Sequence, residues 1–390
     1  MSQEYDPLAS VQAAGPPGTI SFIYGLPDPS TFPVDELRDA FDQVFGKSSA
    51  LALQYGPEQG YGPLIDYLRE KIRREEGISL ERPQIMLSGG ASQALDHICS
   101  LFTRPGDYVL VEAPTYHESL QLFRDHRLQP LQIPIDEQGL KAEELASCLN
   151  SLRKKGEEAR LLYVIPNFQN PSGITLSEKR RKAVLDVVKE TNILVVEDDV
   201  YFDLSFEESK LPSLFSLEHR EGVIRLGSFS KIIAPGLRLG WIMGPSKSIE
   251  LLTESGLRRM GGGPNPLAAN AISLYCQKGH LESHIDSVRS VYRKRRDIML
   301  ETLQSDMPEG VHWTKPQGGF FVWLTLPHHL RAEKVVKQAK SNRLLILAGD
   351  PFFAQSVPGQ HLRLAFSYLA AEKIREGIEK LAHILRSSEF

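Results

Sequence analysis

Hydroxyl, ammonium and guanidinium groups come together between residues 228 and 238. Ser228, Ser230 and Lys231 follow a run of apolar residues, and Arg238 comes seven positions after the lysine. A lysine amine attacks an aldehyde only in its neutral form, and desolvation or a nearby cation lowers its pKa from about 10.4. Hydroxyls and a guanidinium are donors that a phosphate dianion prefers. A lone lysine at a strand end is most often a surface residue, but this whole set predicts a nucleophilic amine beside a phosphate site.

Further polar groups follow other apolar runs, where the carboxyl ends of buried strands are expected. These segments are 88–93, 113–116, 166–173 and 196–201. In open α/β sheets, ligands bind at the carboxyl ends of the strands, so the segments are expected to meet at one site. Taken one at a time, each segment also fits an ordinary turn.

In their chain order, these segments resemble the motifs of the fold type I, class I and II aminotransferases over roughly residues 20–385. The resemblance implies pyridoxal 5'-phosphate as the cofactor, held as a Schiff base on Lys231. It also implies that Ser228, Ser230 and Arg238 hold the cofactor phosphate.

The same resemblance assigns the residues around the cofactor ring. It implies that Asp198 keeps the pyridine nitrogen protonated, so that the ring can accept electrons from the Cα atom of the substrate. Tyr201 and Asn170 would bond the ring oxygen, and Asn170 would also lie beside the substrate. Tyr116 would stack on the face of the ring. Asp199 matches a common second acid, and it is expected at the surface or behind the site.

The remaining matches concern the phosphate, the substrate and a second subunit. Ala91 and Ser92 would begin a helix, and their amides would contact the phosphate, because a helix N-terminus favours an anion. Arg363 would clamp the α-carboxylate of the substrate with its planar guanidinium, and the backbone of Gly25 would lie against the substrate. Tyr55 matches a tyrosine that reaches the phosphate of the neighbouring subunit, which implies a homodimer with composite sites.

The expected reaction is transfer of an amino group from an α-amino acid to a 2-oxo acid, with glutamate and 2-oxoglutarate as one pair. The pattern is closest to 2-aminoadipate, kynurenine and valine-type aminotransferases. A pyridoxal-phosphate enzyme that eliminates, replaces, cyclises or decarboxylates an amino acid is the alternative. A ligand-sensing domain of a transcription regulator would need a DNA-binding domain before it, and the first motif lies near the start of the chain. The glycines at 261–263 replace a stretch that is often rich in Ser, Thr and Gln, and their role is left open.

The arrangement of apolar runs predicts an α/β fold with a mostly parallel sheet flanked by helices, plus a smaller α+β domain. We expect a large domain over 46–280 and a small domain from 1–45 and 281–390. Strands are expected at 84–87, 108–112, 161–165, 193–197, 223–227, 239–243, 319–324, 343–347 and 361–366. Helices are expected at 91–102, 177–190, 281–305 and 370–387.

Composition sets broad limits on partners. With 41% hydrophobic and 24% charged residues, the 390-residue chain is typical of a globular protein, and its net charge of −4 does not favour nucleic acid or an anionic membrane. No stretch approaches 18 apolar residues, so no membrane span is expected. Cys99, Cys148 and Cys276 lie far apart, which predicts neither a disulfide framework nor a metal site and favours the cytoplasm.

Overall fold

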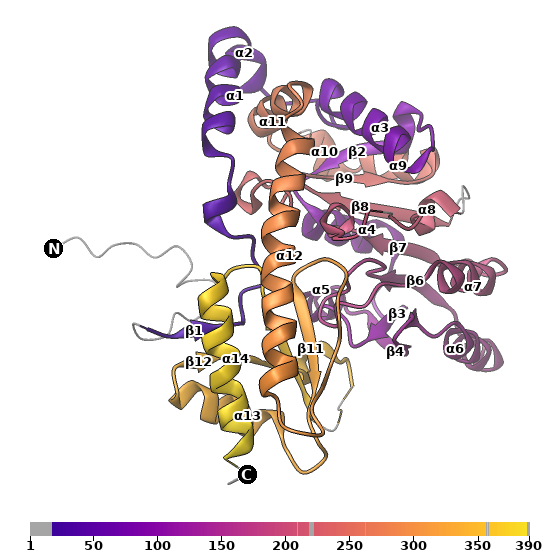
Figure 1. Ribbon diagram of the computed structural model, residues 1–390. Helices are drawn as coiled ribbons and strands as arrows, with labels where there is room; N and C mark the ends of the chain where they lie inside the picture. Colours follow the sequence, from indigo (N-terminus) through magenta and orange to yellow (C-terminus); the bar gives the residue numbers. More distant parts are fainter. Residues whose placement is uncertain are drawn as a thin grey trace.

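The computed structural model describes residues 18–208, 210–217, 222–261, 263–355, 357 and 359–387 (Figure 1). The larger part of the chain is built on an eight-stranded sheet with the strand order β2-β9-β8-β7-β6-β3-β4-β5. Its strands are β2 (Ile85–Ser88), β3 (Tyr108–Ala113), β4 (Gln129–Asp136), β5 (Gly139–Leu140), β6 (Ala159–Val164), β7 (Leu194–Asp198), β8 (Val223–Ser228) and β9 (Gly240–Met243).

The five strands β4, β3, β6, β7 and β8 are parallel, whereas β9 is antiparallel to both β8 and β2. The expected mostly parallel sheet is therefore confirmed. Strand β6 shows why the sequence favours it, because its apolar run Leu161–Val164 is buried throughout and can face helices on both sides. Parallel strands end at the same edge of the sheet, and the polar segments predicted from the sequence follow these ends.

Helices connect the strands and cover the sheet (Figure 1). They are α3 (Gly62–Glu76), α4 (Ala91–Phe102), α5 (His117–Asp125), α6 (Ala142–Lys155), α7 (Glu178–Val188), α8 (Leu214–Leu217), α9 (Ser246–Thr253), α10 (Gly256–Gly261) and α11 (Pro266–Gln277). Helix α4 has the predicted bounds. Helix α7 begins after Ser177, whose hydroxyl accepts a hydrogen bond from the amide of Arg180 and so caps the first turn.

The two ends of the chain meet in a smaller part. Strand β1 (Ile20–Ser21) pairs in parallel with β12 (Leu344–Leu345), and a second sheet has the order β10-β11-β14-β13. The strands of that sheet are β10 (His312–Trp313), β11 (Phe321–Thr325), β13 (Leu347–Ala348) and β14 (His361–Ala365). Its helices are α13 (Ala332–Ser341) and α14 (Ala371–Arg386). The long helix α12 (His280–Asp306) runs along both parts and packs against α14 (Figure 1).

Some segments differ from expectation, and others were not foreseen. The single strand predicted at 343–347 is wrong, because Leu344–Leu345 pairs with β1 while Leu347–Ala348 pairs with β14. Strand β4 was not predicted, since its two prolines are rare inside sheets. The helices α1 (Val34–Lys47) and α2 (Ser49–Ala52) follow the first strand, and α1 packs against α11 of the larger part.

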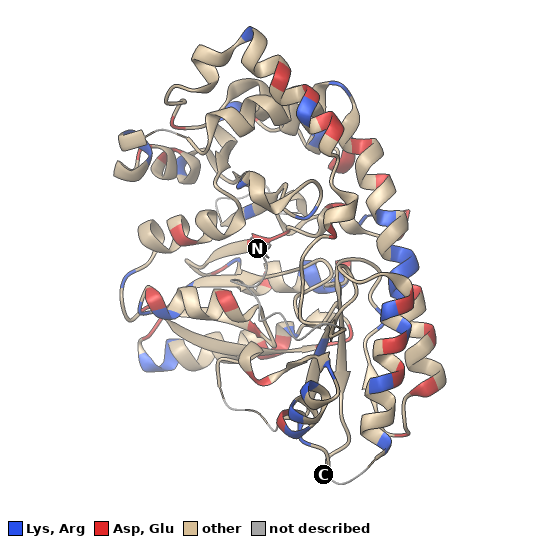
Figure 2. Ribbon diagram, turned by 90° about the vertical axis from the view of Figure 1, so that its left-hand side faces the viewer, with Lys and Arg blue, Asp and Glu red and all other residues tan. Residues whose placement is uncertain are grey.

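Charged residues of both signs are interspersed along the helices of the surface (Figure 2). Within the described ranges, no helix has both the length and the apolar character that crossing a bilayer requires. Among the same residues, no group of three His, Cys, Asp or Glu side chains is arranged to hold a metal ion.

Candidate active site

The carboxyl ends of the central strands open into a pocket of about 600 Å³, a size that is common for small-molecule sites. The smaller part of the chain closes the pocket from the other side. Twelve of the thirteen predicted site residues line it: Gly25, Ala91, Ser92, Tyr116, Asn170, Asp198, Tyr201, Ser228, Ser230, Lys231, Arg238 and Arg363. The thirteenth, Tyr55, does not.

Lys231 lies in the turn after β8. Its Nζ atom donates a hydrogen bond to the carbonyl oxygen of Gly25 at 3.2 Å. The pKa of the amine is lowered to about 8, mainly by burial and also by the cations Arg363 and Arg238, while Asp198 opposes the shift. A substantial fraction of the amine is therefore neutral near pH 8, as attack on an aldehyde requires.

The predicted phosphate donors surround the N-terminus of α4. No side chain caps this helix, so its first amides face the pocket with the positive end of the helix dipole. Gly90 precedes the helix with φ of 95°, and a Cβ atom there would lie 2.8 Å from Nη2 of Arg238. Arg238 also donates to the carbonyl oxygen of Gly89 at 2.9 Å, while Ser228 and Ser230 lie on the pocket wall. Glycine is favoured at position 90 because the backbone angle strains any other residue, and a side chain there would also displace the guanidinium of Arg238.

Asp198 ends β7 and is buried. Its Oδ2 atom accepts a hydrogen bond from the hydroxyl of Tyr163 at 2.6 Å. Its Oδ1 atom is buried and has no hydrogen-bond partner among the described residues. Burial raises the pKa of Asp198 to about 6, an effect that Tyr163 opposes and Asp199 reinforces. Leaving a buried acceptor without a donor costs free energy, so we expect a ligand to supply a cationic or N–H partner for this oxygen.

Three further polar side chains line the pocket between Asp198 and the smaller part. They are Asn170, from the loop after β6, Tyr201, from the turn after β7, and Tyr116, which precedes α5. Burial raises the pKa of Tyr201 and raises that of Tyr116 to about 12, so both phenols are neutral at physiological pH and can donate hydrogen bonds.

Arg363 projects from β14 into the same pocket. Its Nη1 atom donates to Oδ1 of Asn170 at 3.1 Å, and its Nη2 atom donates to the carbonyl oxygen of Ile23 at 2.7 Å. The rings of Phe321 and Phe352 lie 4.5 and 5.0 Å from the guanidinium carbon. Within the described part of the chain no carboxylate forms an ion pair with Arg363, and its Nε atom is buried without a partner. This buried cation is available for an anionic ligand.

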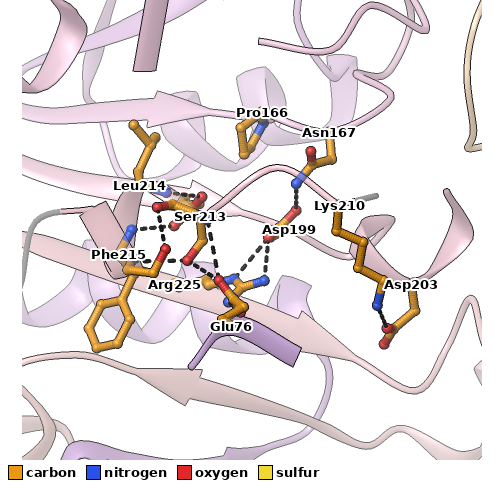
Figure 3. A network of polar contacts seen from close by, with 12 residues as sticks. Glu76, Pro166, Asn167, Asp199, Asp203, Lys210, Ser213, Leu214, Phe215 and Arg225 are labelled. Atoms are coloured by element: carbon orange, nitrogen blue, oxygen red, sulfur yellow. Dashed lines mark hydrogen bonds and ion pairs between the residues drawn. The ribbon is translucent and has the colours of Figure 1, made fainter. Parts of the chain in front are cut away.

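A buried ion-pair network lies behind the pocket (Figure 3). Arg225 donates to Oδ2 of Asp199 at 2.8 Å and also pairs with Glu76, while Asn167 donates to Oδ1 of Asp199 at 2.6 Å. The side chain of Asp199 is fully buried, so the surface position considered from the sequence is wrong. The network joins the loop after β6 to the end of β7, and therefore holds together the two segments that carry Asn170 and Asp198.

Several pocket residues were not predicted from the sequence. Tyr163, His117, Phe321 and Leu347 all line the cavity. Tyr163 lies within a run of aliphatic residues that reads only as a buried strand. Its hydroxyl group is the feature that could have indicated a polar contact, because a buried tyrosine hydroxyl usually has a hydrogen-bond partner.

The remaining predictions concern residues outside the pocket. Tyr55 is 77% exposed. In the glycine stretch, Gly262 lies outside the described residues, and Gly261 ends α10.

The pocket fits pyridoxal phosphate in three independent respects. The uncapped helix end with Gly90 and Arg238 provides a cradle for a phosphate dianion. The partnerless oxygen of Asp198 suits a protonated ring nitrogen. The amine of Lys231 lies in the same cavity with a lowered pKa, as a link to an aldehyde requires.

Comparison with known proteins agrees with this geometry. The family model for aminotransferase class I and II matches residues 25–381. The aromatic-amino-acid aminotransferase 1 of Thermococcus litoralis is 38% identical over 94% of this chain and 88% of that protein.

Two solved structures share the whole fold. A kynurenine aminotransferase of Pyrococcus horikoshii superposes with a TM-score of 0.92 at 38% identity, covering 98% of this chain and 94% of its own. The α-aminoadipate aminotransferase LysN of Thermus thermophilus, in complex with N-(5'-phosphopyridoxyl)-L-leucine, superposes with a TM-score of 0.87 at 35% identity. That match covers 95% of this chain and 93% of its own.

Proposed function

Because the chain belongs to the class I and II aminotransferase family, we propose that its pocket accepts α-amino acids with large, mainly apolar side chains. The protein is a pyridoxal-phosphate-dependent aminotransferase. When bound, pyridoxal phosphate supplies an aldehyde that takes up the amino group and a ring that spreads negative charge from the substrate's Cα.

For the chemical step, we assign the main roles to Lys231 and Asp198. Lys231 would hold the cofactor aldehyde, and its amine would move the proton at the substrate's Cα as base and then as acid. Its lowered pKa supports this role, since the neutral amine must be populated to accept a proton. Asp198 would keep the ring nitrogen protonated through its free oxygen, while Tyr201 and Asn170 would donate to the ring oxygen and Tyr116 would cover one face of the ring.

Anions are held at two ends of the pocket. The first amides of α4, at Ala91 and Ser92, would bind the cofactor phosphate together with Arg238 and the hydroxyls of Ser228 and Ser230. Arg363 lies near Asn170 and binds the substrate α-carboxylate in a bidentate manner. A Cβ atom at position 25 would lie 2.5 Å from the ring of Phe321. Glycine is therefore needed there for Phe321 to pack against the backbone that would lie beside the substrate.

The rest of the lining supports an apolar side chain on the substrate. Ile23, Leu26, Phe321 and Leu347 border the space around Arg363. Two of the relatives are named for aromatic amino acids and for kynurenine, which agrees with this lining, whereas a third is named for α-aminoadipate, whose side chain carries a second carboxylate. We retain glutamate and 2-oxoglutarate as one substrate pair. Their second carboxylate could accept hydrogen bonds from His117 and from hydroxyl groups of the described lining. Beyond Lys231, Arg238 and Arg363, which are already assigned, that lining contains no Arg or Lys.

A spectral screen of the purified holoenzyme tests this function. Each amino acid is added alone, and loss of the visible cofactor band reports transfer of the amino group; a 2-oxo acid should then restore the band. We expect kcat/KM for phenylalanine or leucine to exceed that for alanine by about 10- to 100-fold, since burying a large apolar side chain is worth about 1.5–3 kcal/mol. Formation of more than one product molecule per active site without any 2-oxo acid would contradict transamination, and equal rates for alanine and phenylalanine would contradict the substrate class.

We also propose a homodimer with composite active sites. Tyr55 lies on the surface near the end of α10, where a Cβ atom on Gly261 would be 3.9 Å from its ring. Leu53, Leu257 and Met260 are exposed as well, at 66%, 60% and 86%. Such an apolar surface is typical of a subunit contact. Sedimentation should give about twice the chain mass of 43.7 kDa, and a monomer would contradict the composite site.

Two expectations from the sequence stay proposals. We keep the division into a large domain at 46–280 and a small domain from 1–45 and 281–390; the pairing of β1 with β12 supports it, whereas α1 packs against α11 of the larger part. We also keep the cytoplasm as the location, supported by three cysteines that form no disulfide. Limited proteolysis would test the division, and cell fractionation would test the location.

A further inference from the structure

The hydroxyl group of Tyr163 makes a short contact with the acid at the bottom of the pocket. Tyr163 lies on β6, beside β7, and is fully buried. Its hydroxyl donates to Oδ2 of Asp198 at 2.6 Å, whereas Oδ1 of the same carboxylate has no partner among the described residues. The two oxygens therefore have different surroundings, and only one remains available to a ligand.

The phenol ring is held firmly in this position. Phe123 of α5 contacts it edge to face, with the ring centroids 5.5 Å apart. Ser119 of the same helix donates to the carbonyl oxygen of Tyr116 at 2.6 Å and so ties the start of this helix in place. A donor fixed by packing loses little conformational entropy when it binds, so its hydrogen bond retains more of its strength.

Few other groups support Asp198. Its neighbour Asp199 belongs to the ion-pair network behind the pocket, where its carboxylate accepts hydrogen bonds from Arg225 and Asn167 (Figure 3). Among the described residues Tyr163 is the one side chain that donates to Asp198, and the amide of Val200 adds a backbone contribution.

We propose that Tyr163 is a positioning residue, which keeps Asp198 ionised and turns its free oxygen toward the nitrogen of the cofactor ring. This inference rests on the role proposed above for Asp198. Tyr163 acts through the carboxylate, because its hydrogen bond stabilises the charged form of the acid in a buried site where desolvation favours the neutral form. With the donor removed, the acid becomes more basic and competes with the ring nitrogen for the proton.

The pH dependence follows from the groups that face Asp198. These are Tyr163 from β6, Glu112 from β3, Asp199 beside it, Lys231 from the turn after β8, and the phenols of Tyr116 and Tyr201. Burial raises the pKa of Asp198 to about 6 in spite of the Tyr163 hydrogen bond. Loss of that bond raises the pKa further, so the ionised acid disappears at a higher pH as the solution is acidified.

The test replaces the hydroxyl while keeping the ring, with Tyr163→Phe. Affinity of the apoenzyme for pyridoxal phosphate is measured by quenching of tryptophan fluorescence between pH 5 and 8. We expect the affinity to fall about 10-fold near neutral pH, because a hydrogen bond to a charged group is lost, and its decline on acidification to begin at a higher pH. In the reaction with an amino acid, kcat should fall while KM changes little.

A matched control is Tyr275→Phe in α11. Tyr275 is also buried and donates to a backbone carbonyl oxygen, but it does not line the pocket. It should leave the affinity and its pH dependence unchanged. A Tyr163→Phe variant that shifts neither the pH dependence nor the split between kcat and KM, or that behaves like the control, overturns the proposal. Should this variant not fold, 3-fluorotyrosine at position 163 provides a stronger donor and must shift the pH dependence in the opposite direction.

Comparison with Asp198→Asn separates this inference from the proposed function. In that background, adding Tyr163→Phe should cause no further loss of affinity, because the charge on which the tyrosine acts is gone. If Asp198→Asn alone has the affinity of the natural enzyme, the role proposed for Asp198 fails. If Asp198→Asn is impaired but Tyr163→Phe is not, only the inference about Tyr163 fails.

Discussion

Replacing Lys231 with alanine is expected to lower the rate of amino-group transfer by about 10⁴-fold. The change removes the amine that holds the cofactor aldehyde and the group that moves the proton at the substrate's Cα. No other amine lines the described pocket, so nothing nearby can take over either task. The rate of loss of the cofactor band after mixing with phenylalanine measures the effect in a single turnover.

Lys182→Ala provides the control for a general effect of removing a lysine. Lys182 is 59% exposed on α7 and pairs with Glu178 at the surface. This variant should keep the natural rate. If Lys231→Ala retains more than about a tenth of that rate, Lys231 is not the base, since a positioned base contributes at least about 10²-fold.

Asp198→Asn is expected to cause the second largest loss, about 10³-fold in kcat. The substitution keeps the shape of the side chain and removes its charge. A charge pair at about 4 Å with an effective dielectric of about 20 contributes roughly 4 kcal/mol, and without it the ring nitrogen loses its proton near neutral pH. Stopped-flow absorbance with phenylalanine, at saturating substrate, gives the rate directly.

The surface acid Asp186 on α7 offers the comparison for this variant. Asp186→Asn changes the net charge by the same amount in an exposed position and should leave kcat unchanged. A loss of less than about 5-fold for Asp198→Asn would mean that the acid does not control the ring nitrogen, because a charge pair worth roughly 4 kcal/mol corresponds to a far larger change in rate.

The sequence predicted those parts of the site that lie in continuous segments. Lys231 and Arg238 could be recognised because the turn after β8 carries the amine and the phosphate donors within a few residues. Strands such as 161–165 could be recognised from their uninterrupted apolar character. The fold class followed from such runs, because strands buried on both faces favour a parallel sheet.

Contacts between distant segments could not be predicted in the same way. Arg225 stands inside an apolar run, and a buried arginine indicates an acidic partner, but the sequence does not specify Glu76 and Asp199. The hydrogen bond from Tyr163 to Asp198 depends on the register between β6 and β7. The division of the 343–347 segment depends on which of two sheets each half joins.

The proposed function depends on a covalent link between the cofactor aldehyde and Lys231. Reduction of the holoenzyme with borohydride would make that link permanent, and mass spectrometry of a digest would locate it. We predict that one peptide, containing Lys231, carries the added phosphopyridoxyl group. An unmodified Lys231 in reduced holoenzyme, or the group on a different lysine, would contradict the role of this amine.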